Sequence, residues 1–363
     1  MTLSSTGSFN ASTLFDGKRL TLARELSGIN KTQLARDLDK STAAVSGWES
    51  GTKRPSPANV SMLALRLGVD PEFFIARNSF SSALLPAPHY RSLRSTTQAH
   101  RRQSQRFVEQ VRETVLGLEQ YVEFPSLNLP ELPAELSSEP TMVPETAARE
   151  LRRSWNLGTG PIPHLLRTVE ENGIVVVFST NQVATIDAFS IYVHPRPLVV
   201  LNPQKDDYYR QRFDLAHEIG HLVMHQDADP GNKLLERQAD RFSAEFLTPA
   251  DRIAELLPTR INSSAWIRLK ELKEDWGVSI QSLLYRARTL GVLDDVAYRN
   301  AMITLTKRGW RRSEPGAKAI RELPSLLPAA LELLESEGYE SSILSTEFGV
   351  HLKVFEAATA RGI

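Results

Sequence analysis

Residues 213–226 read FDLAHEIGHLVMHQ, a stretch that places three histidines and a glutamate inside an otherwise apolar run. The apolar residues recur at helical spacing, which predicts a helix buried in a core. His217 and His221 lie four residues apart, so both imidazoles project from the same face of that helix. Two imidazoles one turn apart can bind a single zinc ion, while the adjacent Glu218 is placed to act as a general base. The stretch therefore predicts a metal site on a core helix.

A helix that supplies two ligands needs a third ligand from elsewhere in the chain. Downstream, LLERQADRFSAEFLTP (residues 234–249) places Glu236 and Asp240 on one helical face. We expect Glu236 to be the third ligand and Asp240 to accept a hydrogen bond from the second nitrogen of a ligand histidine. His225 is the alternative third ligand, but it lies another turn along the first helix, where we expect a partly exposed residue. Gly220 leaves the ligand-bearing face bare, so that another element can approach.

The bulk composition describes a globular protein of more than one domain. The chain has 363 residues, of which 41% are hydrophobic and 24% charged. Its formal net charge is zero, so any contact with nucleic acid must come from a local basic patch. The absence of cysteine excludes disulfides and thiolate metal sites. No secretory signal or membrane-spanning run is recognisable, so we expect a cytoplasmic protein that makes no membrane contact.

Composition also divides the chain into parts, and it predicts a multidomain, mainly α-helical fold with a small sheet. Three apolar runs predict short strands, namely GIVVVF (173–178), DAFSIYV (187–193) and PLVVLN (197–202). The expected parts are a disordered N-terminus (1–14), an all-α domain (15–77), a basic helix with a Pro-rich acidic linker (78–145), an α+β domain (146–308) and a helical C-terminal region (309–363) whose role the sequence does not reveal.

The metal-site region resembles a known family. RQRFDLAHEIGHLVMH followed by ERQADRFSAEFLTP is similar to the ImmA/IrrE family of zinc metallopeptidases, over about residues 146–290. The resemblance implies a zincin-like fold and one Zn²⁺ per chain. It carries the family's zinc ligands onto His217, His221 and Glu236, and the family's catalytic glutamate onto Glu218.

Residues near the predicted strand pair are candidates for contact with a substrate. Tyr192, His194 and Arg196 could donate hydrogen bonds to an oxyanion or to the substrate, although each could equally be an ordinary surface residue. The strand 187–193 could also pair with an extended substrate by adding it to the sheet.

The N-terminal domain carries a second resemblance. Five short helices are expected over residues 16–77, and KTQLARDL (31–38) and STAAVSGWESG (41–51) predict two of them joined by a tight turn. Q-L-A followed by V-S-x-W-E-x-G resembles the XRE (Cro/CI-like) helix-turn-helix family over about 60 residues. The resemblance implies double-stranded DNA as a partner and Ser41–Ser50 as the recognition helix. The expected DNA-facing residues are Gln33, Ser41, Thr42, Ala43, Ser46, Gly47, Lys53 and Arg54.

The recognition face nevertheless lacks strong base readers such as arginine, asparagine and glutamine. Residues 16–77 hold ten basic and seven acidic residues, a modest excess of positive charge. A helical protein-interaction domain of the same fold therefore stays open as the alternative to DNA binding.

Two further stretches allow two interpretations each. The arginine run at 91–106 is either an arm for the DNA backbone or a solvated helix face that pairs with the acidic linker. Residues 266–293 read either as a second helix-turn-helix module or as helices that pack the peptidase core. We favour packing for the second stretch, with Arg286 and Arg288 as surface charges.

These features together predict a DNA-binding transcription regulator that carries a zinc-dependent endopeptidase. The resembled family implies a repressor-type protein as substrate, either a partner or the chain itself, in the control of stress or mobile-element genes. A homodimer is one option for its assembly. The alternatives are a regulator without proteolytic activity, whose peptidase-like domain senses a ligand or metal, and an antitoxin or phage-defence component.

Overall fold

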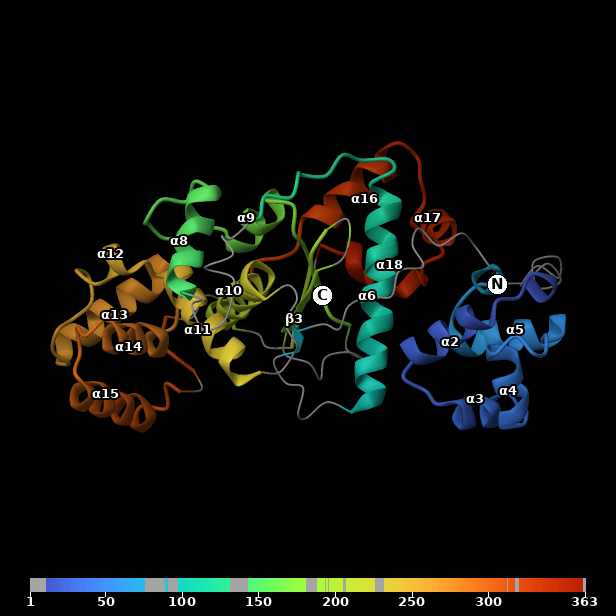
Figure 1. Ribbon diagram of the computed structural model, residues 1–363, viewed down its shortest axis with the longest axis horizontal. Helices are drawn as coiled ribbons and strands as arrows, with labels where there is room; N and C mark the ends of the chain where they lie inside the picture. The colour runs from blue at the N-terminus through green and yellow to red at the C-terminus, as the bar shows by residue number, and fades with distance from the viewer. Residues whose placement is uncertain are drawn as a thin grey trace.

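The computed structural model is mainly helical with one small sheet, as the sequence predicts (Figure 1). The predicted disordered stretch lies mostly outside the described residues. None of the described helices combines the length and apolarity needed to cross a membrane. The structure describes residues 11–75, 89–90, 97–130, 143–180, 188–192, 194, 196–204, 207–225, 232–311, 313–316 and 320–361.

The N-terminal region forms the predicted bundle of short helices. Asn30, Ser41 and Ser56 cap three of them, each accepting a hydrogen bond from the backbone N–H three residues ahead. A Cβ atom on Gly17 would lie 2.3 Å from the Trp48 carbonyl oxygen. Only glycine therefore lets the helix that begins at Gly17 approach the end of the helix that contains Trp48. The helices are α2 (Gly17–Leu26), α3 (Lys31–Asp37), α4 (Thr42–Glu49), α5 (Pro57–Leu67) and the 3₁₀ helix η1 (Pro71–Phe74).

The sheet has the strand order β1-β3-β4-β2. β3 (Ala188–Ile191) and β4 (Leu198–Leu201) form the predicted antiparallel pair, with Ala188 opposite Leu201. β2 (Val175–Phe178) runs parallel to β4, and the short β1 (His89–Tyr90) pairs antiparallel with β3 at the opposite edge. The sequence did not predict β1, because two residues carry no readable alternation.

One face of the sheet packs against the helices that carry the candidate metal site. Its residues share a hydrophobic cluster with those helices, and the strand contributions are Val176, Phe178, Ala188, Val199 and Leu201. The helices nearest the sheet are α8 (Pro144–Ser154), α9 (Leu165–Glu171), α10 (Tyr208–Met224) and α11 (Lys233–Leu247). Beyond them lie α12 (Ala250–Ile253), α13 (Ser263–Trp276), α14 (Ile280–Thr289) and α15 (Asp295–Lys307).

The stretch 266–293 packs the core of this domain, as we favoured. Its buried residues, Trp266, Leu269, Leu272, Trp276 and Leu283 among them, belong to the same cluster as the sheet. The expectation for Arg286 is wrong, because its side chain is only 5% exposed and binds the Glu245 carboxylate and the Thr248 carbonyl. Arg288 does lie at the surface, where it pairs with Asp295.

The opposite face of the sheet is covered by segments from both ends of the chain. α6 (Gln98–Leu118) packs there with α16 (Leu326–Ser336), α17 (Ser341–Phe348) and α18 (Leu352–Thr359). The strands present the alternate residues Val175, Val177, Phe189, Ile191 and Val200 to this second cluster. The basic helix and the C-terminal region, which composition separated, are therefore parts of one layer.

This layer also holds the N-terminal domain, which lies beyond α6 and α18 (Figure 1). Arg106 Nε lies 2.9 Å from Glu25 Oε2, and Gln103 Nε2 donates to the Leu26 carbonyl at 2.8 Å. Arg106 thus ties two helices of the protein together and fits neither interpretation of the arginine run. Arg91 and Arg94, at the start of that run, lie outside the described residues.

Gly117→Ala tests the contact between α6 and α17. A Cβ atom on Gly117 would lie 2.3 Å from the Phe348 ring, although alanine favours a helix over glycine by about 1 kcal/mol. We expect the overlap to cost about 1–3 kcal/mol and to outweigh the propensity gain. Urea unfolding should show a lowered free energy of unfolding. In a Phe348→Ala background the same substitution should no longer destabilise, and an unchanged loss there would contradict this contact.

His351 makes the docking of the N-terminal domain sensitive to pH. Its Nε2 lies 3.2 Å from the Leu67 carbonyl oxygen, and burial lowers the pKa of its ring below the ordinary value. A lowered pKa means that His351 contributes stability above the unfolded pKa of about 6.5, and that this contribution is lost as pH falls. We expect Tm to fall more between about pH 7.5 and pH 5.5 in the wild type than in His351→Asn, which keeps a helix cap. Equal falls in Tm would contradict the assignment.

Candidate metal centre

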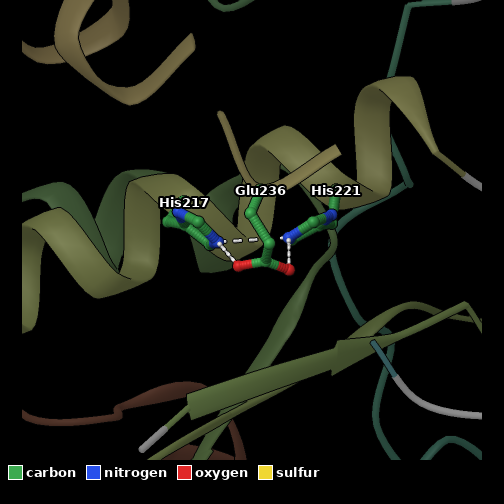
Figure 2. A group of neighbouring side chains, drawn as sticks. All are labelled: His217, His221 and Glu236. Atoms are coloured by element: carbon green, nitrogen blue, oxygen red, sulfur yellow. Dashed lines mark hydrogen bonds and ion pairs between the residues drawn. The ribbon is translucent and has the colours of Figure 1, made fainter. Parts of the chain in front are cut away.

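Three side chains converge between α10 and α11. His217 Nε2 and His221 Nε2 lie 3.1 Å apart, and the Glu236 oxygens lie 3.3 Å from His217 Nε2 and 3.6 Å from His221 Nε2 (Figure 2). One ligand atom from each residue lies within 4.8 Å of the others. Two imidazole nitrogens that face each other at this distance repel if both carry lone pairs alone. A shared cation between them and the carboxylate removes that repulsion.

The outer nitrogens of both histidines are held by hydrogen bonds. His217 Nδ1 lies 2.9 Å from Asp240 Oδ1, the partner expected from the sequence. His221 Nδ1 lies 3.0 Å from His225 Nδ1, and His225 Nε2 lies 3.0 Å from Gln238 Oε1. With protons on the Nδ1 atoms of both ligand histidines, their Nε2 lone pairs face the cluster.

His225 is therefore not the partly exposed residue that we expected. Its side chain is 3% exposed, because α11 folds back across the end of α10 and places Gln238 against it. His225 lies four residues after His221, and that spacing was the available sequence signal. The spacing suggested His225 only as a metal ligand, whereas its side chain contacts Nδ1 of His221.

Glu218 lies fully buried beside the cluster. Its Oε2 accepts a hydrogen bond of 2.8 Å from Ser190 Oγ on β3. Its Oε1 is buried without a hydrogen-bond partner among the described residues. Burial raises the pKa of Glu218, and His221 and His217 act against that rise. An unsatisfied buried carboxylate oxygen costs free energy unless a further group binds it, so this atom is open to a water or a substrate.

Ser190 is a site residue that the sequence analysis missed. It is the polar member of an otherwise apolar strand, between Phe189 and Ile191, which face the other side of the sheet. That single polar position was the only sequence signal. Its partner Glu218 is 28 residues away in the chain, so only the packing of β3 against α10 reveals the contact.

Close packing of two helices brings Glu236 to the histidines. A Cβ atom on Gly220 would lie 3.0 Å from the Phe242 ring, so the bare face that we predicted is where α11 approaches. Glu236 lies in the first turn of α11, where the helix dipole favours a negative charge. Burial acts to raise the pKa of Glu236, but the influence of the neighbouring His217 and His221 outweighs it and lowers the pKa to about 2.

The donor set fits zinc. Two imidazole nitrogens and one carboxylate are the ligands of a common class of catalytic zinc site, which keeps a further position open. The histidines are buried, and the contacts of their Nδ1 atoms with Asp240 and His225 are compatible with ligation through Nε2. The orphaned oxygen of Glu218 lies on the same helix, one residue from the first ligand candidate.

The three candidate substrate residues differ in position. The guanidinium of Arg196 binds the Glu119 carboxylate and the Pro125 carbonyl, and its role toward a substrate stays a prediction. Tyr192 is 39% exposed just after β3, and His194 is exposed while its carbonyl accepts from Arg112. Roles for Tyr192 and His194 stay predictions.

The predicted DNA-facing residues gather on α3, on the start of α4 and on the turn after it. Gln33, Thr42, Ala43, Lys53 and Arg54 are exposed, and Ser46 is half-buried. The Ser41 hydroxyl accepts from the Ala44 N–H at 3.1 Å, so it caps the recognition helix. Gly47 does not belong to this face, because it is buried against the Lys53 side chain.

Comparison with known families agrees with the two parts of the structure. Residues 20–74 match the helix-turn-helix family model, and residues 169–288 match the family model described as the IrrE N-terminal-like domain. No curated protein matches the chain. The chain therefore combines a DNA-binding helix-turn-helix region with an ImmA/IrrE-type peptidase domain, in that order.

His225→Phe tests whether the outer hydrogen bonds matter for metal binding. The substitution keeps an aromatic ring in place but removes the partner of His221 Nδ1. Loss of such a partner typically weakens metal affinity about 10–100-fold, and we expect a loss in this range. Competition with a chromogenic chelator measures it. The matched control, His164→Phe at an exposed position, should bind zinc like the wild type, and equal affinities of all three proteins would refute the role of His225.

Proposed function

We propose that the chain is a DNA-binding regulator whose peptidase domain is a zinc-dependent endopeptidase that hydrolyses a repressor-type protein, either a partner or the chain itself. The observation that carries the proposal is the convergence of His217 Nε2, His221 Nε2 and the Glu236 carboxylate next to the orphaned oxygen of Glu218. Buried carboxylate oxygens in a structural core normally have a hydrogen-bond partner, and Oε1 of Glu218 has none among the described residues.

The chemistry follows from which atoms are occupied. When bound by His217, His221 and Glu236, zinc polarises a scissile carbonyl and makes water a better nucleophile near neutral pH. Ser190 holds Oε2 of Glu218, which leaves Oε1 to take a proton from the attacking water and to deliver it to the leaving amine.

The DNA-binding part of the proposal depends on the exposed start of α4. Thr42 and Ala43 are small and exposed there, so they can contact thymine methyl groups or let the backbone approach the groove. Lys53 and Arg54 follow in the next turn, where a cation can contact phosphate. Specificity would then come largely from DNA shape.

A second candidate function is a ligand sensor without proteolysis. One observation favours it, a cavity of about 810 Å³ beside the candidate metal site. Asp240, which binds His217, lines this cavity together with Tyr285, Tyr298 and Trp310. A ligand there would contact a residue that orients a metal ligand. Retained regulation by a protein that cannot cleave would favour this candidate.

Glu218→Gln separates the two candidates. The amide cannot serve as a general base, so we expect the cleavage rate to fall about 10²–10⁴-fold while zinc stays bound. The measurements are the metal content by mass spectrometry and the appearance of fragments when the chain is expressed with a candidate repressor. His217→Ala is the metal control and should hold much less zinc. If wild type and Glu218→Gln cleave and regulate identically, the endopeptidase proposal fails.

Lys53→Ala combined with Arg54→Ala tests DNA binding. If both side chains contact phosphates, the slope of log K against log salt concentration should become shallower by about 2, and affinity should fall for all sequences alike. Fluorescence anisotropy of the full chain with promoter fragments measures both quantities. The charge-matched control is Arg299→Ala with Lys307→Ala, at exposed positions of α15, and it should leave the slope unchanged. Equal slopes for the two double variants would contradict the DNA-facing surface.

A further inference from the structure

A segment that precedes the peptidase domain forms the edge of the sheet next to the candidate metal site. β1 (His89–Tyr90) comes after the helix-turn-helix region and before α6, and it pairs antiparallel with β3. In the strand order β1-β3-β4-β2, β4 fills the other side of β3. β1 therefore occupies the remaining hydrogen-bonding edge of the strand that faces α10.

The strand register places β1 opposite Ser190, the residue that contacts Glu218. His89 is paired with Ser190, and Tyr90 with Phe189. Paired residues of antiparallel strands have Cα atoms about 4.5–5.5 Å apart. Ser190 is the residue whose hydroxyl binds Glu218 at 2.8 Å. The backbone of His89 thus passes one strand spacing from the residue that holds the proposed general base.

A protein substrate needs the same place. An extended peptide that pairs with the edge of β3 would run beside Ser190, whose hydroxyl binds Glu218. An extended polypeptide gains affinity by adding its backbone N–H and C=O groups to an open strand edge. A strand edge can pair with only one partner at a time. The edge of β3 that β4 leaves open is the one that β1 takes.

We propose that β1 is an internal occupant of the strand edge at which an extended polypeptide substrate binds. The chain's own segment and a substrate then compete for β3, and the peptidase is held in a low-affinity state while β1 is paired. This inference rests on the proposed peptidase function, because it names the competitor as the substrate. The ligand class is an unfolded or extended segment of protein, bound through its backbone.

The weak pairing of β1 is offset by its high effective concentration, so a substrate can compete with it. β1 comprises two residues, so few hydrogen bonds hold it, and a two-residue strand is weak by itself. Because it belongs to the same chain, its effective concentration is of millimolar order, which a weak contact needs in order to persist. The described elements before and after the segment belong to one docked unit, since η1 ends the helix-turn-helix region and α6 binds that region through Arg106 and Gln103. Undocking of the N-terminal domain would separate these elements.

The test removes the backbone donors of β1. His89→Pro with Tyr90→Pro leaves neither residue an N–H for β3, whereas the control His89→Ala with Tyr90→Ala keeps both. Hydrogen–deuterium exchange of residues 188–191 is measured in the full-length, metal-free proteins. We expect exchange about tenfold faster in the proline variant and unchanged in the alanine variant. Equal exchange in the proline variant and the wild type would show that β1 does not occupy the edge.

Substrate competition is measured separately, by binding of fluorescein-labelled β-casein, an unfolded polypeptide. Each variant is combined with Glu218→Gln and loaded with zinc, so that binding is read without turnover. We expect the proline variant to bind about tenfold more tightly than the alanine variant. Faster exchange without tighter casein binding would overturn the competition.

A disulfide gives a test that does not depend on the proline variant folding. The chain has no cysteine of its own, and Tyr90 and Phe189 are paired in register. In Tyr90→Cys with Phe189→Cys, oxidation should lock β1 in place and weaken casein binding, and a phosphine reductant should restore it. Equal binding before and after reduction would overturn the inference. The proposed function fails on a different result, the loss of Glu218-dependent cleavage in the wild type.

Discussion

The close crossing of α10 and α11 is the constraint on which the candidate site depends. Gly220 lets the Phe242 ring lie against the ligand-bearing face of α10, and this brings Glu236 within reach of both histidines. The approach also buries His217, Glu218 and His221, which is costly unless their polar atoms find partners. α11 supplies those partners through Asp240 and, by way of His225, through Gln238. After this packing, Oε1 of Glu218 has no hydrogen-bond partner among the described residues, and it lies beside the atoms that could bind a metal.

The sheet lies between the candidate metal site and the helical layer that contacts the N-terminal domain. Alternation along β3 turns Ser190 toward Glu218, while Phe189 and Ile191 face the layer formed by α6 and the C-terminal helices. The helix-turn-helix domain docks on that same layer through Arg106, Gln103 and His351. The two activities implied by the two family matches therefore lie on opposite sides of one small sheet. A displacement of β3 would be felt in both hydrophobic clusters.

The sequence predicted features that depend on neighbouring residues, and it missed contacts between residues that are far apart in the chain. The common face of the two histidines, the strand pair and the short helices of the N-terminal domain were predicted, because each depends on the spacing of a few neighbouring residues. The expected exposure of His225 and Arg286 was wrong, because their partners lie on other elements. A polar residue is assumed exposed unless a partner is known, and no local pattern reveals a partner that is dozens of residues away. β1 was missed because two residues have no periodicity to read.

By itself, the sequence determined which residues can do chemistry and which face of which helix carries them. It assigned His217 and His221 to one face, placed Glu218 beside them and identified Glu236 one helix later, because helical geometry converts spacing into direction. Only the tertiary structure decided how these groups are completed. Ser190 binds Glu218, His225 binds His221, and β1 pairs with the strand that carries Ser190. Those contacts join segments far apart in the chain, and they exist only once the sheet and the two helices have packed.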